Sequence, residues 1–406
     1  MIRIIINISI VISIITKICF CQTGTVFTHS FTHFDTTRTY KTYTPATYTG
    51  QNAWPVIINF HGYTHTADLH MNYTVMNVDA DTAEFLVVYP QGLVVTDLIW
   101  GDSDYGWNVP GAYSAGHNDI SFTEELINDI KSNYNVDSSR IHVTGFSTGA
   151  EMVFYLGCVL ADKVASVAGV SGGLYYHHLD SLQPSRPISA LVIFGTDDPW
   201  FPEAGDQNYP PIAATPSFFA HANGCISDSL VTDLPNINTE DSSTVTLITY
   251  QNCEAETEVL FYRINNGKHR WPGVTTPGLS NRDISANDEI MKFFQANPHP
   301  TGAVQIDDHD FSGIAEPSLY ENHPNPFNPT TTINYDLPEI SNVNITIYDV
   351  TGREVVTLEN EEQLAGHYEI NWSGVDQSGN QVTTGVYFTR LQAGQYSQTI
   401  KMLYLK

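Results

Sequence analysis

Basic side chains are scarce in this sequence of 406 residues. Only 17 lysines and arginines stand against 44 aspartates and glutamates, and the formal net charge is −27. A field of this sign repels nucleic acid and anionic membrane surfaces, which are therefore poor candidates for partners, and it favours solubility in a salty medium. Hydrophobic residues still make up 42% of the chain, as in folded proteins, and the length allows two domains with a large core.

Long apolar runs are also missing, with one exception at the N-terminus. The run from Ile4 to Ile15 follows a positive charge and is too short to span a bilayer. It predicts a secretory signal peptide over residues 1–21. Cleavage before Gln22 is expected because Cys19 and Cys21 are small residues at the two positions that a signal peptidase inspects. A lipoprotein anchor on one of these cysteines is the less favoured alternative, and no integral membrane segment is expected in the mature protein.

Cysteines are few as well, and only three of the five remain after the signal peptide. In an oxidising compartment two of the three can pair. Cys225 and Cys253 lie in polar, loop-like contexts, whereas Cys158 lies in an apolar, helix-like stretch. We therefore expect a Cys225–Cys253 disulfide and a buried free thiol at Cys158.

Up to about residue 297, predicted strands alternate with predicted helices. A capping box at Ser121–Glu124 predicts one helix start, and a last helix is expected from Ser285 to Gln295. Most of the strands are continuous apolar runs, as expected for parallel strands covered on both faces. They are Trp54–Phe60, Phe85–Tyr89, Arg140–Thr144, Val164–Val170, Ala190–Phe194 and Val259–Arg263. The alternation predicts a doubly wound α/β sheet over residues 22–297.

The chain then changes character. Residues 298–319 are polar and rich in proline, glycine and aspartate, which predicts a linker. Beyond it, alternating strands separated by glycine, asparagine and aspartate turns predict a small all-β sandwich of the immunoglobulin type over residues 320–406. The expected strands are Thr332–Leu337, Val343–Tyr348, Gly366–Trp372, Gly385–Leu391 and Gln395–Leu405.

The motif Gly-x-Ser-x-Gly at Gly145–Gly149 stands between a predicted strand and a predicted helix. Glycines permit a sharp strand-to-helix turn that exposes the Ser147 hydroxyl, and the helix N-terminus aims amide donors at a developing oxyanion. The same pattern recurs around Ser171, but no helical period follows it. We therefore expect Ser147 to be the nucleophile of a serine hydrolase, and Ser171 to end the next core strand.

An activated serine needs a base, and the base needs an orienting acid. In the α/β-hydrolase plan the order is Ser, Asp or Glu, then His, each in a loop after a core strand. Asp198 and His269 satisfy that order. Asp197 is the alternative acid, and an ordinary turn aspartate and a surface histidine are the bland alternatives. The sequence thus predicts an α/β-hydrolase with a Ser147–His269–Asp198 triad.

The oxyanion hole requires backbone donors from two loops. One is expected from Thr148, after the nucleophile, and the other from Tyr63, with Thr64 as the alternative. The nearby histidines at 61, 65 and 70 share no helical face, and no cysteine or carboxylate set joins them. We therefore predict no metal site, and the chemistry needs no cofactor.

Several short segments together resemble the secreted esterases that include feruloyl esterases, acetylxylan esterases and polyhydroxybutyrate depolymerases (carbohydrate esterase family 1 and its relatives). These segments are His61-Gly62, Tyr89–Gly92, Trp107-Asn108, Asn118-Asp119, Gly145–Met152, Gly195–Asp198 and His269–Gly273. The resemblance implies the same triad and the same disulfide. It also implies that Trp107, Trp271 and His61 lie near the substrate, with core packing as the alternative for the tryptophans. Lys268 and Tyr63 depart from the family pattern.

The C-terminal part resembles the sorting domain of the bacterial type IX secretion system. The matching segments are Asn322–Thr330, Ile347–Arg353, Ala365–Tyr368, Trp372–Gly374, Val382–Phe388 and Lys401–Lys406. The resemblance implies export by that machinery, to the cell surface or the medium. An ordinary adhesive sandwich module is the alternative.

These observations together predict a secreted serine carboxylic ester hydrolase whose substrate is a neutral polymeric or small ester. Acylated plant polysaccharide of the feruloyl or acetyl xylan type is the leading substrate, and a polyester such as polyhydroxybutyrate is the alternative. A serine peptidase and a non-catalytic surface binding protein are the remaining alternatives.

Overall fold

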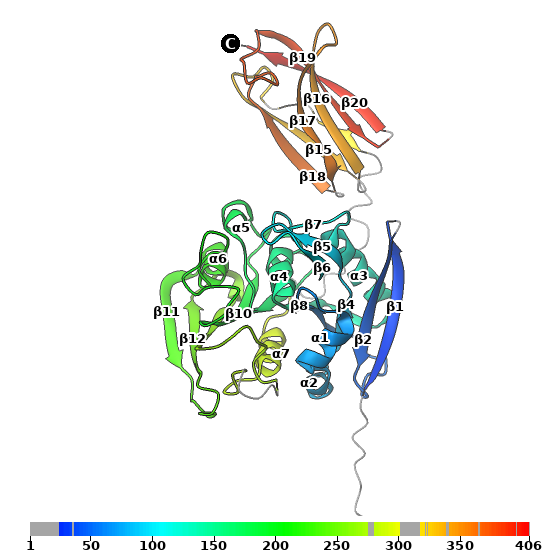
Figure 1. Cartoon of the computed structure of the whole chain (residues 1–406). Coiled ribbons are helices and arrows are strands. Elements are labelled where there is room, and N and C mark those ends of the chain that lie inside the picture. Colours follow the sequence, from blue (N-terminus) through cyan, green and yellow to red (C-terminus); the bar gives the residue numbers. More distant parts are fainter. Residues whose placement is uncertain are drawn as a thin grey trace, which may run out of the picture. The chain divides into compact units, whose positions relative to one another are not determined.

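The computed structural model describes residues 24–405 except 35, 275–279, 301–316, 321, 323, 338–340, 364–365 and 395. The predicted signal peptide and most of the predicted linker lie outside the described residues. The chain divides into two compact units, Met1–Ala303 and Val304–Lys406, and each is described by itself (Figure 1).

A ten-stranded sheet forms the centre of the first unit (Figure 1). Its six middle strands are parallel, and they are the six that the apolar runs predict. The sequence did not predict the antiparallel pair at each edge, because those strands are rich in threonine and serine and are partly exposed. In spatial order the strands are β1 (Thr25–His33), β2 (Thr36–Thr44), β4 (Leu86–Pro90), β3 (Trp54–Phe60), β8 (Val136–Phe146), β9 (Ser166–Val170), β10 (Ser189–Gly195), β13 (Val259–Asn265), β12 (Thr244–Gln251) and β11 (Ile226–Asp233).

Helices cover both faces of this sheet. Side chains alternate across a strand, so Val56 and Ile58 of β3 enter one hydrophobic cluster while Ile57 enters another. The first cluster includes residues of α3 (Asp119–Asn133), α4 (Thr148–Val159) and α6 (Ala214–Ala222). The second includes residues of α1 (Ala67–Thr74), α2 (Met76–Ala83) and α7 (Ala286–Ala296). The short helix α5 (Tyr176–Ser181) contacts α6. The arrangement confirms the predicted doubly wound α/β fold.

Two helix starts can be compared with the sequence-based predictions. The last helix, expected from Ser285, begins at Ala286, and Ser285 caps it by accepting a hydrogen bond from the Asp288 amide. The predicted capping box at Ser121 is wrong. Helix α3 begins earlier, at Asp119, because the side chain of Asn118 accepts from the amides of Ile120 and Ser121.

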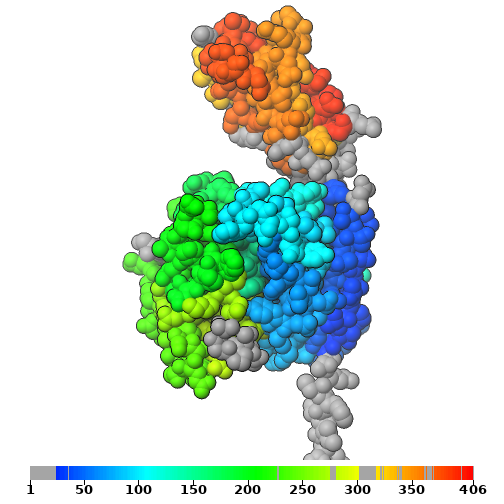
Figure 2. All heavy atoms as spheres, in the orientation of Figure 1, coloured from blue at the N-terminus to red at the C-terminus, as the bar shows by residue number. Residues whose placement is uncertain are grey.

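A small second sheet follows β4 and was not predicted. It consists of β5 (Leu93–Asp97), β6 (Ser103–Gly106) and β7 (Tyr113–Ser114), in the order β6-β5-β7. Its residues lie at the surface of the first unit, where Figure 2 shows them in cyan. The tip of the β5–β6 hairpin, residues 97–102, contributes to the wall of the pocket described below.

The second unit is a sandwich of two antiparallel sheets around its own core, which includes Tyr335, Ile345, Trp372 and Leu391. This confirms the predicted small all-β domain. The sequence did not predict β17, which carries four glutamates among its ten residues and so lacks a clear apolar alternation. One sheet holds β14 (Ser318–Leu319), β15 (Thr331–Leu337) and β18 (Gly366–Trp372); the other holds β17 (Glu354–Gln363), β16 (Ser341–Asp349), β19 (Gly385–Ala393) and β20 (Tyr396–Tyr404).

A buried ion pair joins β2 to the start of α3. Arg38 Nη2 lies 2.7 Å from Asp119 Oδ1, and both side chains are almost fully buried. Burial alone would raise the pKa of Asp119, but His117, whose Nε2 lies 3.3 Å from Oδ2, the charge of Arg38 and the Asn108 amide hold that pKa below its usual value. The Arg38 guanidinium also lies over the ring of Phe122.

We expect Arg38→Ala to lower the free energy of unfolding of the first unit by about 3 kcal/mol or more, because it leaves Asp119 buried without its cation. Lys41 on the same strand pairs with Asp68 at the surface, so Lys41→Ala should cost less than about 1 kcal/mol. Urea unfolding of the two variants checks this difference. Equal losses would show that the buried pair does not anchor β2.

Candidate active site

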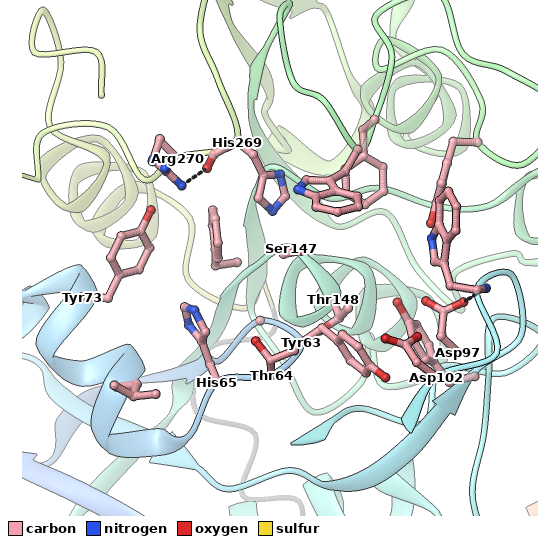
Figure 3. Close-up of a pocket in the computed structure, with 18 residues that line it drawn as sticks. Tyr63, Thr64, His65, Tyr73, Asp97, Asp102, Ser147, Thr148, His269 and Arg270 are labelled. Atoms are coloured by element: carbon pink, nitrogen blue, oxygen red, sulfur yellow. Dashed lines mark hydrogen bonds between the residues drawn. The ribbon is translucent and has the colours of Figure 1, made fainter. Parts of the chain in front are cut away.

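The backbone turns sharply between β8 and α4, and Ser147 occupies the turn with φ 55° and ψ −120° (Figure 3). Close contacts require glycine at both Gly145 and Gly149. A Cβ at Gly145 would lie 2.4 Å from the Gly149 oxygen, and one at Gly149 would lie 2.2 Å from the Phe60 oxygen. No larger residue fits either position without a shift of the backbone. This is the geometry of a nucleophile elbow.

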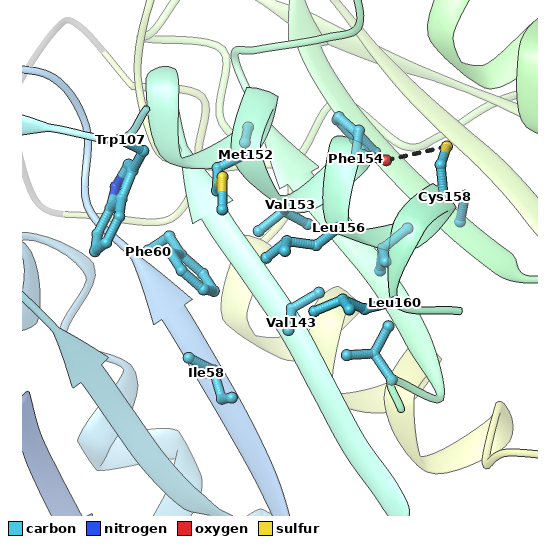
Figure 4. Packing of buried hydrophobic residues seen from close by; sticks show 14 of the residues in the cluster. Ile58, Phe60, Trp107, Val143, Met152, Val153, Phe154, Leu156, Cys158 and Leu160 are labelled. Carbon is cyan, nitrogen blue, oxygen red and sulfur yellow. Dashed lines mark hydrogen bonds between the residues drawn. The ribbon is translucent and has the colours of Figure 1, made fainter. Parts of the chain in front are cut away.

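The helix that follows Ser147 is anchored by its apolar side chains. Met152, Val153 and Leu156 are fully buried. They lie beside Ile58 of β3 and Val143 of β8 (Figure 4). Each such side chain contributes about 1.5–3 kcal/mol on burial. The packing holds the N-terminus of α4 against the sheet and thereby fixes the position of Ser147.

Asp198 and His269 meet across two loops. Asp198 follows β10 and His269 follows β13, and these strands are parallel neighbours, so their carboxyl ends lie at the same edge. His269 Nδ1 lies 2.7 Å from Asp198 Oδ2. The other carboxylate oxygen accepts from the amides of Trp200 and Phe201, at 2.9 and 3.2 Å. Asp198 is thus buried, with both oxygens engaged, and orients the imidazole.

Ser147 and His269 line the same pocket, and Figure 3 shows the imidazole beside the serine. Within the described part of the chain, no hydrogen bond joins the Ser147 hydroxyl to His269. Catalytic hydrogen bonds are often long in an empty site and tighten when substrate binds. The three predicted triad residues are therefore together, with the acid–base contact formed and the base–nucleophile contact open.

The two expected oxyanion donors also lie at this pocket. Tyr63 and Thr148 line it beside Ser147, and neither backbone amide donates to any backbone oxygen among the described residues. The Thr64 amide donates to the Tyr105 oxygen at 2.8 Å. The alternative donor Thr64 is therefore occupied, and Tyr63 and Thr148 hold the free amides.

Two alternatives from the sequence do not fit the site. Ser171 also has a positive φ, 53°, but it is 1% exposed, and it is absent from the pocket lining. Asp197 turns outward and pairs with Lys268 at 2.8 Å, with both side chains about half exposed. Lys268, which departs from the pattern of the esterases that the sequence resembles, thus forms an ion pair at the surface.

The predicted substrate contacts of Trp107, Trp271 and His61 are wrong, because all three side chains are fully buried and none lines the pocket. The indole nitrogens donate inside the protein, Trp107 to the His61 oxygen at 2.8 Å and Trp271 to Asn287 at 2.9 Å. Core packing, the alternative for the tryptophans, is confirmed.

His61 supports the oxyanion loop from behind. Burial lowers its pKa to about 4, so the ring is neutral at ordinary pH. Its Nε2 accepts from the Gly92 amide at 2.9 Å, which leaves Nδ1 as the donor to the Gly62 oxygen at 2.8 Å. The ring therefore ties the loop before Tyr63 to the loop after β4.

The pocket has a volume of about 580 Å³. Tyr73 and Arg270 lie toward one end and Asp97 and Asp102 toward the other, with Ser147 between them (Figure 3). The lining residues that the sequence-based prediction missed include two tryptophans, Trp100 and Trp200. Each follows an aspartate just after a strand, and that Asp-x-x-Trp or Asp-x-Trp spacing is the signal that could have found them.

A buried carboxyl group lies behind the pocket wall. Glu151, in the first turn of α4, accepts a hydrogen bond from the Tyr175 hydroxyl at 2.9 Å. The Tyr175 ring in turn lies 5.5 Å from the ring of Tyr209, which lines the pocket. Burial raises the pKa of Glu151 to about 8, so it is protonated and neutral near pH 7.

The cysteine prediction is confirmed. Cys225 and Cys253 form a disulfide, and Cys158 is a buried free thiol whose pKa is raised by burial. Within the described residues, no group of three His, Cys, Asp or Glu side chains could hold a metal ion. No helix in that part of the chain has the length and apolar character needed to cross a membrane.

Comparisons with known proteins agree with this fold. Residues 47–212 match the model of the phospholipase/carboxylesterase family, and residues 327–399 match that of the FlgD Ig-like domain. The fold and the site define the first unit as an α/β-hydrolase, and an immunoglobulin-like domain follows it.

Several curated proteins are similar to parts of this chain. Feruloyl esterase B of Piromyces equi is 29% identical over 236 residues, which are 55% of this chain and 41% of that protein. Poly(3-hydroxyalkanoate) depolymerase C of Paucimonas lemoignei is 29% identical over 121 residues, 30% of this chain and 28% of that protein. The chain thus spans less than half the length of these two relatives. The acetyl xylan esterase structure from Aspergillus awamori covers 66% of this chain and 99% of its own, at 15% identity and a TM-score of 0.47.

Because the pKa of the Glu151 carboxyl group is raised, we predict that the stability of the protein depends on pH. Its pKa is about 8 in the folded protein and about 4.5 in an unfolded chain. Between these values the folded state retains a proton that the unfolded state releases, so this group makes the protein less stable as the pH rises from about 4.5 to 8.

Glu151→Gln keeps the shape and removes the titration. We expect its thermal midpoint to exceed that of the unmodified protein at pH 8, with a smaller or no gain at pH 5. The surface variant Glu125→Gln, on α3, should show no such difference. A Glu151→Gln gain that is equal at both pH values would contradict a buried, protonated Glu151.

Proposed function

We propose that this chain is a secreted serine carboxylic ester hydrolase that acts on acylated plant polysaccharide, of the feruloyl or acetyl xylan esterase type. The observation that carries the proposal is the elbow at Ser147 in one pocket with the Asp198–His269 pair and two free backbone amides. Serine esterases need this set of groups and no cofactor.

In the proposed reaction, Ser147 Oγ attacks the ester carbonyl carbon while His269 Nε2 takes the hydroxyl proton. Asp198 holds the imidazole through Nδ1 and stabilises the imidazolium. The amides of Tyr63 and Thr148 donate to the oxyanion of the tetrahedral intermediate. His269 then returns the proton to the departing alcohol, and water hydrolyses the acyl-enzyme by the same steps to release the acid.

The proposed substrate is supported by the names of the similar proteins and by the negative net charge of this chain. Feruloyl esterase B is the longer of the two curated matches described above. A strongly acidic protein also suits a neutral polymer better than an anionic one. A polyester depolymerase is the alternative, and the similarity to poly(3-hydroxyalkanoate) depolymerase C supports it.

We further propose that residues 1–21 direct the chain out of the cytoplasm and that residues 320–406 are recognised by the type IX secretion machinery. The disulfide supports an oxidising destination. The C-terminal segments quoted above are the basis for the second proposal, and the all-β fold of this unit is compatible with it.

Product analysis by chromatography tests the enzymatic proposal. The protein is incubated with feruloylated arabinoxylan, acetylated xylan and polyhydroxybutyrate, beside Ser147→Ala and the control Ser171→Ala. We expect release of ferulate or acetate, a loss of at least about 10³-fold in Ser147→Ala because the nucleophile is absent, and little change in Ser171→Ala.

Other results of this product analysis would support the alternative functions. Release of 3-hydroxybutyrate alone would replace the polysaccharide assignment with the polyester one. No product that depends on Ser147 would overturn both assignments, and cleavage of amide substrates would then separate a serine peptidase from a non-catalytic binding protein.

A further inference from the structure

The exposure of the tryptophans is uneven. The chain has six, and four of them are at most 9% exposed. Trp100 and Trp200 are 62% and 57% exposed, and both line the pocket that contains Ser147. Large aromatic side chains that stay in water at the mouth of a pocket mark a binding surface more often than a packing role.

Each of the two indoles is presented by a rigid turn. Asp97, at the end of β5, accepts from the amides of Ile99 and Trp100 at 2.7 and 2.9 Å. Asp198, after β10, accepts from the Trp200 amide at 2.9 Å. The two turns come from different sheets, so Trp100 and Trp200 reach the pocket from separate parts of the fold. Their backbones are held before any ligand binds, which reduces the entropy lost on binding.

Polar groups that line the same pocket as these tryptophans favour a ligand that carries hydroxyl groups. The Asp102 side chain is exposed and lines the pocket at the β5–β6 tip. The Thr148 hydroxyl is buried and has no hydrogen-bond partner among the described residues, although the residue lines the pocket. A carboxylate only accepts hydrogen bonds, so a ligand without donors would leave Asp102 unpaired wherever that ligand displaces its water.

This requirement separates the two candidate polymers. A polyester chain offers ester oxygens, which accept hydrogen bonds, and methyl or methylene groups, but no donors. A polysaccharide offers hydroxyl donors at the ring edges and apolar ring faces that stack on aromatic side chains. Of these two polymers, only the polysaccharide offers partners for both the indoles and the Asp102 carboxylate.

We propose that Trp100, Trp200 and Asp102 form a subsite that binds sugar units of a neutral polysaccharide next to the reacting ester. The two indoles stack on sugar rings, and Asp102 accepts hydrogen bonds from ring hydroxyls. This inference rests on the proposed function, because it names the residues of the same site that would bind the polysaccharide chain.

The first test compares two substrates in the full chain. We measure kcat/KM for an acylated xylo-oligosaccharide and for 4-nitrophenyl acetate, which has no sugar. The ratio of the two should fall about tenfold or more in Trp100→Ala and in Trp200→Ala, by analogy with the loss of one aromatic stacking contact. It should fall less in Trp100→Phe, which keeps an aromatic ring, and in Asp102→Asn, which keeps an acceptor.

Leu98→Ala is the matched control, because Leu98 is 56% exposed on the same hairpin tip but does not line the pocket. Its ratio should equal that of the unmodified protein. An unchanged ratio in both tryptophan variants would overturn the subsite, and so would a selective loss on polyhydroxybutyrate rather than on the oligosaccharide.

A binding measurement separates this inference from the proposed function. Ser147→Ala is titrated with unacylated xylohexaose, and the tryptophan fluorescence is followed. We expect a saturable change that is lost in Ser147→Ala/Trp100→Ala. If the protein cleaves no ester yet shows this change, the esterase proposal fails and the subsite stands. If it cleaves esters and shows no change with xylohexaose, the subsite is overturned and the esterase stands.

Discussion

The strained backbone of Ser147 is the constraint on which the rest of the site depends. A residue other than glycine at φ 55° and ψ −120° costs of order 1–3 kcal/mol and persists only where its surroundings impose it. Here the core packing of α4 imposes it, together with contacts so close at Gly145 and Gly149 that neither tolerates a Cβ. The same contacts bring the first turn of α4 against the end of β3. The Thr148 amide and the loop that carries Tyr63 therefore reach the serine from two sides.

Buried polar groups around this turn act on the site through other residues. The neutral imidazole of His61 links the oxyanion loop to Gly92. Asp198 uses one carboxylate oxygen to orient His269 and the other to hold the turn that presents Trp200. Glu151 lies behind the tyrosines of the pocket wall. Residues that hold the reactive groups thus also hold groups that line the pocket. A substitution in such a residue is therefore expected to affect both sets of groups.

The sequence-based predictions failed where they depended on how exposed a side chain or a strand is in the folded protein. Trp107 and Trp271 stand near motif residues in the chain, yet their indoles fill the core, because each donates a hydrogen bond to a buried acceptor. Trp100 and Trp200 each follow an aspartate in a turn, but that spacing does not show whether a side chain is exposed, and only the fold shows that the two turns meet at one pocket. The edge strands β1, β2, β11 and β12 were missed because partly exposed strands rich in threonine and serine lack the continuous apolar runs that identified the six parallel strands.

The sequence by itself determined the class of fold, the elbow, the disulfide and the order of Ser147, Asp198 and His269 along the chain. These follow from local patterns: apolar runs, glycines where the backbone is crowded, and polar residues at the ends of strands. Tertiary structure alone decided which of the paired candidates take part in the site. Asp198 points inward while Asp197 pairs with Lys268, the Tyr63 amide stays free while that of Thr64 is bonded, and Ser171 is buried. Each choice depends on the direction of one side chain or amide, and that direction is set by neighbours that are distant in sequence.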